Sequence, residues 1–148
     1  MIKVFVYGTL KPGEVNYSQC DRWVIEACPA IAMGQVYQLP FGYPAMVANG
    51  KGIVQGAVLS FADSAILQQL DEFEQHDPDV FQRYCPRLSP DAHHYQRRAI
   101  GVFNPEGISL GSVWTYLMTS TQVLQIGGVL VPSGNWRGID IPPQMPSS

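Results

Sequence analysis

The chain has 148 residues, of which 46% are hydrophobic and 14% charged, and its formal net charge is −3 at pH 7. This length and composition predict one folded domain over residues 1–148 and argue against a disordered chain. The nine basic residues are scattered, so the basic face that nucleic-acid binding requires is not expected. No apolar run approaches the roughly 20 residues that cross a bilayer, so no membrane partner is expected.

The first residues and the cysteines bear on location. Residues 1–6 enter a strand-like run directly, without a charged leader or a cleavage site. Cys20, Cys28 and Cys85 make an odd count without Cys-x-x-Cys spacing, which favours reduced thiols over a disulfide framework. We therefore expect a cytoplasmic protein.

Strand and turn signals dominate the first third of the chain. Residues 2–7 form a β-branched and aromatic run that Gly8 ends, which predicts a buried strand and a sharp turn. Apolar residues at helical spacing predict a short helix over 17–27, ended by Pro29. The next elements expected are a strand over 30–39, a turn at 40–44 and a short strand at 45–47.

A hairpin and an amphipathic helix are predicted next. Asn49-Gly50-Lys51-Gly52 is a hairpin signal that would join the strand at 45–47 to one at 53–61. Asp63 or Ser64 is a suitable N-cap for a helix from Ala65 to about Glu74. The apolar residues of this helix follow the pattern of a core-facing stripe, and they are Ile66, Leu67, Leu70 and Phe73.

The last part of the chain again alternates strands and turns. The elements expected are a long loop at 75–94, strands at 95–103 and 109–118 around a turn at 104–107, a short helix near 122–126 and a Gly/Pro-rich tail. Parallel βαβ units are not apparent. The pattern favours an α+β domain with a curled, mostly antiparallel sheet.

The turn Val6-Tyr7-Gly8-Thr9-Leu10 is the first candidate site. A strand that ends in glycine and continues in small polar residues exposes several backbone N–H groups in one place. Such groups bind carboxylates or stabilise oxyanions. The spacings of phosphate-binding glycine loops are absent. Considered alone, such a segment is more often an ordinary strand-to-loop turn.

Glu74 is the second candidate. It lies four residues beyond Leu70, at the border of the core-facing stripe, while Asp71 and Glu72 turn further towards water. A carboxylate at such a border is partly desolvated, which raises its pKa and suits it to proton transfer. The alternative is a solvated acidic helix end.

Other polar and reactive side chains carry weaker signals. Arg97 or Arg98 could pair with a substrate or with the acidic helix end, and Tyr116 could present its hydroxyl to a ligand. His76, His93 and His94 lack partners at metal-ligand spacing, so we expect no metal site. A hydrolase with Cys85 or Cys20 as nucleophile is a third reading without a local signature.

Taken together and in order, these segments resemble the γ-glutamylcyclotransferase-like superfamily, which includes the AIG2-like proteins. The resemblance runs from Val4 to about Trp136. It rests on four motifs, which are Tyr7-Gly8-Thr9-Leu10, Leu70-Asp71-Glu72-Phe73-Glu74, Tyr95-x-Arg97 and Trp114-Thr115-Tyr116. It implies a curled mixed β-barrel flanked by short helices, with a cavity between the N-terminal turn and Glu74.

The resemblance also implies an activity. Family members release 5-oxoproline and a free amine when the α-amino group of a γ-glutamyl unit attacks its own γ-carbonyl. It assigns general acid/base catalysis to Glu74 and substrate binding to Tyr7, Gly8, Thr9 and Leu10, with Tyr116 as an added candidate. This cyclisation requires no cofactor and no metal. The alternative is a non-catalytic module that keeps the cavity for a small carboxylate.

Overall fold

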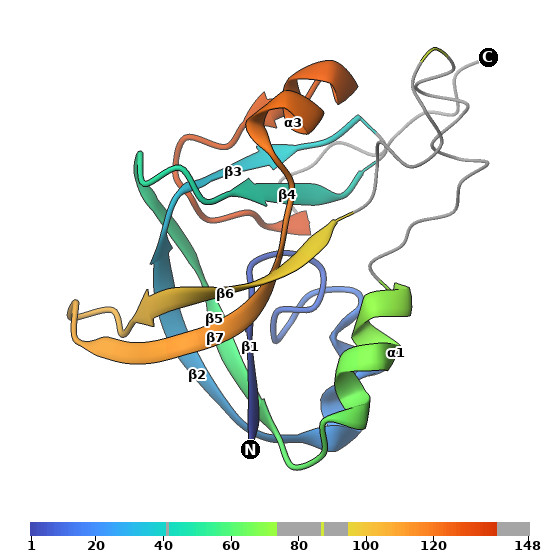
Figure 1. The fold of residues 1–148 in the computed structure, drawn as a ribbon, viewed down its shortest axis with the longest axis vertical. Helices are drawn as coiled ribbons and strands as arrows, with labels where there is room; N and C mark the ends of the chain where they lie inside the picture. The colour runs from blue at the N-terminus through green and yellow to red at the C-terminus, as the bar shows by residue number, and fades with distance from the viewer. Residues whose placement is uncertain (41, 74–86, 88–94, 139–148) are drawn as a thin grey trace.

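The first strand, β1 (Ile2–Val6), is the strand at which the sheet closes on itself. The computed structural model describes residues 1–40, 42–73, 87 and 95–138, and Figure 1 shows their arrangement. β1 pairs antiparallel with β5 (Ile53–Phe61) and parallel with β7 (Ser109–Leu117). Both backbone edges of β1 are therefore occupied.

Five strands form the closed barrel. Their order is β1, β5, β2 (Val24–Met33), β6 (Gln96–Phe103) and β7, which returns to β1. Outside the barrel the described sheet continues from β7 through β4 (Pro44–Val47) and β3 (Gln35–Gln38) to β8 (Val129–Leu130). Only the β1–β7 and β4–β7 pairs are parallel among these described strands. The predicted α+β class and the curled, mostly antiparallel barrel are confirmed.

From Val4 to Val6 the side chains on both faces of β1 are buried, which explains why these consecutive residues are all apolar rather than alternating with polar ones. Phe5 packs with residues of the other barrel strands, such as Val54 and Val102. Val4 and Val6 belong to a second cluster, which also contains Ile66 and Leu70. The two faces of β1 thus contribute side chains to two different hydrophobic clusters.

The second cluster is covered by α1 (Ala65–Phe73), which lies across the lower part of the barrel in Figure 1. The side chain of Asp63 accepts the N–H of Ala65 at 2.9 Å, as expected for a residue at the helix start. Ile66 and Leu70 are buried, which confirms the predicted stripe as far as the side chains are described. Glu74 and the predicted loop, apart from Arg87, lie outside the described residues.

A second α-helix, α3 (Ser120–Ile126), covers the strands outside the barrel. Thr119 and Gln122 form a capping box, and Gly127 ends the helix in the left-handed conformation at φ 90°. The short helix predicted near 122–126 is confirmed, and it begins at Ser120. Among the described residues, no helix has the length and apolar character needed to cross a membrane.

The predicted helix over 17–27 is wrong. The chain makes two 3-10 turns, η1 (Tyr17–Gln19) and η2 (Asp21–Trp23), and then enters β2 at Val24. Pairing with β5 along the whole of β2 overrides the helical spacing of the side chains. The predicted strand over 30–39 is likewise divided at Gly34, where β2 ends and β3 begins.

The predicted hairpin at Asn49-Gly50-Lys51-Gly52 is also wrong, because the two strands that it was expected to pair do not pair with each other. The segment does turn, with Gly50 at φ 71° and the Asn49 side chain accepting the Lys51 N–H at 3.0 Å. The strands on either side do not pair with each other, because β4 joins β3 and β7 while β5 joins β1 and β2. The turn connects the barrel to the outer strands.

Thr115 provides a test of barrel closure. Its fully buried hydroxyl donates to the backbone oxygen of Phe5 at 2.9 Å, across the β1–β7 junction. We expect Thr115→Val to lower the free energy of unfolding by about 1–3 kcal/mol, because a buried carbonyl loses its partner. Urea denaturation measures this loss. Thr121→Val, at an exposed position of α3, is the control, and an equal effect from both variants would contradict the interpretation.

Candidate functional site

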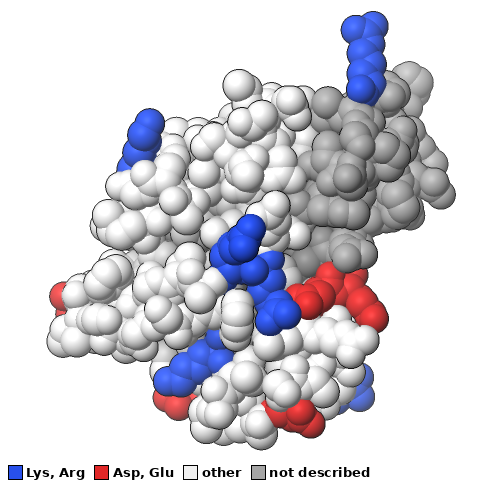
Figure 2. All heavy atoms as spheres, in the orientation of Figure 1, with Lys and Arg blue, Asp and Glu red and all other residues white. Residues whose placement is uncertain are grey.

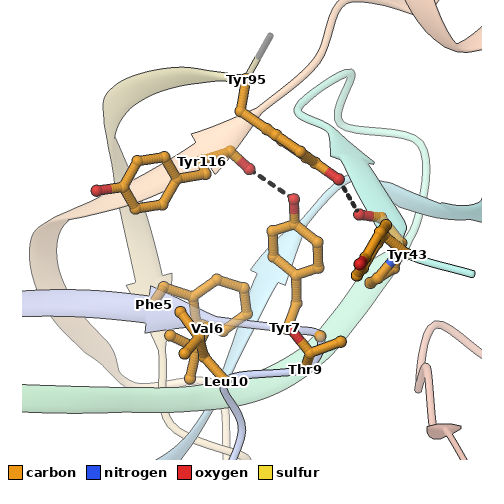
Figure 3. A pocket seen from close by; sticks show the side chains of 10 residues that line it. Phe5, Val6, Tyr7, Thr9, Leu10, Tyr43, Tyr95 and Tyr116 are labelled. Atoms are coloured by element: carbon orange, nitrogen blue, oxygen red, sulfur yellow. Dashed lines mark hydrogen bonds between the residues drawn. The ribbon is translucent and has the colours of Figure 1, made fainter. Parts of the chain in front are cut away.

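A pocket opens where β1 ends. Its enclosed volume is about 30 Å³, room for about two water molecules. The walls come from β1 and its turn, the start of β4, the residue before β6, and β7 (Figure 3). The lining residues are Phe5, Val6, Tyr7, Gly8, Thr9, Leu10, Tyr43, Pro44, Tyr95 and Tyr116.

In the turn after β1, backbone carbonyls accept hydrogen bonds, whereas the N–H groups have no acceptor among the described residues. The carbonyl of Gly8 accepts the N–H of Lys11 at 3.0 Å, and the carbonyl of Thr9 accepts the N–H of Asn16 at 2.9 Å. The N–H groups of Gly8, Thr9 and Leu10 donate to no group within the described part of the chain. Gly8 and Leu10 are buried, and buried N–H groups nearly always have a partner. The turn therefore has three backbone donors without a partner among the described residues, and all three belong to residues that line the pocket.

Gly8 is required by close packing. A Cβ built on Gly8 would lie 2.5 Å from Cγ of Pro44, whose ring forms the opposite wall. Pro44 is the first residue of β4 and is itself buried. Only glycine allows the turn to approach the outer strands this closely, and the approach narrows the pocket.

Two tyrosine hydroxyls tie the pocket walls together (Figure 3). Tyr7 donates to the backbone oxygen of Tyr116 at 2.6 Å, and Tyr95 donates to the backbone oxygen of Pro44 at 2.6 Å. The first bond links β1 to β7, and the second links the start of β6 to β4. Because each bond crosses between elements far apart in the sequence, the pocket depends on the closed barrel.

The Tyr116 side chain lines the pocket, but its hydroxyl is bonded to α1. It donates to Oδ1 of Asp71 at 2.6 Å, and Nε of Arg97 lies 2.9 Å from the same oxygen. Asp71 therefore does not simply face water, as the helical pattern suggested; its side chain is 37% exposed and is bonded to two strands. The predicted pairing of an arginine with the acidic helix end is confirmed for Arg97.

Five of the six predicted site residues meet at this pocket, namely Tyr7, Gly8, Thr9, Leu10 and Tyr116. The sixth, Glu74, lies outside the described residues. The site prediction missed Tyr43, Pro44 and Tyr95. The Tyr-x-Arg motif already drew attention to Tyr95, but nothing local to these residues reveals that they face the turn after β1.

The cysteine hypothesis finds no support at Cys20. This residue is buried beside the second core cluster, and burial together with the charge of Asp21 raises the pKa of its thiol to about 11. Such a thiol is almost entirely protonated at neutral pH and is a poor nucleophile. Cys85 and the three histidines lie outside the described residues.

The barrel and the pocket at the end of its closing strand define a protein of the AIG2-like fold. The family model described as gamma-glutamyl cyclotransferase, AIG2-like, matches residues 4–138. The chain therefore belongs to this AIG2-like gamma-glutamyl cyclotransferase family. A search among curated protein sequences found no match.

Solved structures with the same fold come from distant organisms. An AIG2-like protein from Mus musculus is 26% identical and aligns over 80% of this chain and 77% of its own, with a TM-score of 0.56. An uncharacterized protein from Pyrococcus horikoshii is 18% identical over 95% and 93% of the two chains, with a TM-score of 0.57. A protein specific to uropathogenic E. coli is 13% identical over 94% of each chain, with a TM-score of 0.60. The last two likenesses concern the fold alone.

Gly8→Ala tests the tight packing of the turn. We expect a loss of about 1–3 kcal/mol in the free energy of unfolding, because the new methyl group would overlap the Pro44 ring. Chemical denaturation measures the change. Gly101→Ala is the matched control, since a Cβ at Gly101 in β6 meets no atom within 4 Å. If Gly8→Ala is as stable as this control, the packing argument fails.

The raised pKa of Cys20 predicts an unusual pH dependence of alkylation. In a Cys28→Ser/Cys85→Ser variant, only Cys20 remains to react with iodoacetamide. Because the thiolate is the reactive form and the pKa is about 11, the rate should rise about tenfold per pH unit between pH 7 and 10. The urea-unfolded chain, with an ordinary thiol, should level off near pH 9. Levelling at the same pH in the folded protein would refute the prediction.

Proposed function

We propose that this protein is a γ-glutamylcyclotransferase, which converts a γ-glutamyl amine or peptide into 5-oxoproline and a free amine. The observation that carries the proposal is a set of three backbone N–H groups, those of Gly8, Thr9 and Leu10, which have no partner among the described residues and belong to residues that line the pocket. Membership of the gamma-glutamyl cyclotransferase family supports the reaction type.

The reaction needs a folded substrate and one proton carrier. The α-amino nitrogen loses a proton and attacks the γ-carbonyl carbon, which forms the five-membered ring. The bond from that carbon to the amine nitrogen then breaks, and the departing amine takes up a proton. A single carboxylate performs both proton transfers when its pKa lies near the working pH.

In this proposal the three N–H groups hold the substrate carboxylate or the oxyanion that develops on the γ-carbonyl. Glu74 takes the proton from the α-amino group and returns it to the leaving amine. The cavity volume of about 30 Å³ is well below that of typical ligand pockets, so we expect substrate binding to widen the pocket. Opening the Tyr95–Pro44 hydrogen bond would cost only about 0.5–1.5 kcal/mol, which binding energy readily offsets.

Glu74→Gln tests the proposal directly. The purified protein is incubated with a panel of γ-glutamyl amines and dipeptides, and 5-oxoproline is measured. We expect product from the wild type and a loss of at least about 100-fold from Glu74→Gln, because an amide cannot carry the proton. Glu72→Gln, an exposed acid two residues earlier, is the control and should retain the activity.

Two outcomes would contradict the proposal in different ways. Equal product from the wild type and Glu74→Gln would remove Glu74 from the mechanism. The absence of 5-oxoproline across the panel, with thermal stabilisation by glutamate or 5-oxoproline, would favour the non-catalytic carboxylate-binding module, because a ligand that binds only the folded state raises the unfolding temperature.

A further inference from the structure

One carboxylate oxygen joins α1 to the two strands beside the pocket. Oδ1 of Asp71 accepts the hydroxyl of Tyr116 in β7 at 2.6 Å and lies 2.9 Å from Nε of Arg97 in β6. In Figure 2 acidic and basic side chains meet where the end of α1 lies against these strands. Asp71 is therefore a junction between three elements rather than a surface charge.

The sheet alone places the two donors, Arg97 and Tyr116, next to each other, and α1 adds the acceptor, Asp71. Arg97 and Tyr116 are directly opposite each other in the antiparallel β6–β7 register, so their side chains share a face. The guanidinium of Arg97 also lies over the ring of Trp114, 4.7 Å from its centroid. These contacts restrict both donors to one side of the sheet, where the helix places Asp71.

Tyr116 connects this junction to the pocket. Its backbone oxygen accepts the Tyr7 hydroxyl, its side chain lines the pocket, and its own hydroxyl is held by Asp71. The residue is 5% exposed, so its side chain is enclosed by protein rather than by water. A short bond from a hydroxyl to a carboxylate is strong and directional. The Arg97–Asp71 pair is partly exposed and contributes less to stability.

We propose that Asp71 is a positioning residue, which holds the Tyr116 side chain as a wall of the pocket and fixes the end of α1 against β6 and β7. The chain leaves α1 at Phe73 and continues directly into Glu74. The junction thus anchors the helix from which the chain runs to the residue assigned as acid and base. The effect on catalysis rests on the proposed function, whereas the effect on the pocket wall does not.

The first test needs no activity. In ¹H–¹⁵N correlation spectra, Asp71→Asn should shift the amide signals of Thr9 and Leu10, because the Tyr116 ring, which lines the same pocket, exchanges a charged acceptor for a weaker neutral one. Glu72→Gln, at the exposed neighbour of Asp71, should leave these signals in place. Unchanged Thr9 and Leu10 signals in a folded Asp71→Asn variant would overturn the proposal.

A double-mutant cycle tests the coupling between the junction residues. Asp71→Asn should lower the midpoint of thermal unfolding by about 3 °C in the wild-type background and by less in a Tyr116→Phe background. Arg98→Gln is the control, since among the described residues the Arg98 side chain donates to Gln96 on the exposed face rather than to Asp71. Additive effects of Asp71→Asn and Tyr116→Phe would show that the two residues act independently, against the proposal.

The third test separates positioning from stability. At a temperature where every variant is folded, Asp71→Asn should lower kcat about tenfold while KM changes little, and should add little once Tyr116→Phe is present. Tyr37→Phe, which removes a hydroxyl outside the pocket, should not lower kcat. An unchanged kcat in Asp71→Asn would refute the catalytic effect. If the wild type itself makes no 5-oxoproline, the proposed function fails, and the spectra and the cycle still decide the role of Asp71.

Discussion

Pairing on both edges of β1 is the constraint on which the rest of the structure depends. β5 occupies one edge and β7 meets the other, with the Thr115 and Tyr7 hydroxyls adding bonds across the closing junction. A strand held on both sides delivers its last residues to a fixed place. When the chain then turns at Gly8, the carbonyls of Gly8 and Thr9 accept N–H groups further along the loop, whereas the N–H groups of the turn have no acceptor in the part of the chain that the structure describes. The unpaired donors are thus a direct result of how the barrel closes.

Local signals predicted most of the elements, because those elements depend on nearby residues. The apolar run of β1, the stripe of α1 and the caps of α3 each lie within a few positions of one another. The errors arose where the outcome depends on a distant partner. The spacing over 17–27 suits a helix until β5 pairs with the chain from Val24 onward, and the turn at Asn49-Gly50 says nothing about which strands pair.

The candidate site shows the same division. Its turn was recognisable because glycine and small polar residues follow a buried strand directly. The opposing walls were not, since the bond from Tyr95 to Pro44 spans 51 positions and the bond from Tyr7 to Tyr116 spans 109. A helical wheel likewise places Asp71 relative to the core of its own helix. It has no information about two donors that the β6–β7 register sets beside that helix.

The difference between a binding module and an enzyme in this scaffold lies in one proton-transfer group. In the proposed function, three N–H donors on residues that line a narrow pocket would bind a carboxylate whether or not a reaction follows. Cyclisation additionally requires that a proton leave the α-amino group and reach the departing amine, and backbone amides supply no such step. The barrel by itself therefore supplies the donors of the proposed anion site. In the proposed mechanism the proton transfer depends on Glu74, which follows α1 in the sequence. The bonds between Asp71 and the two strands matter because they hold the end of that helix.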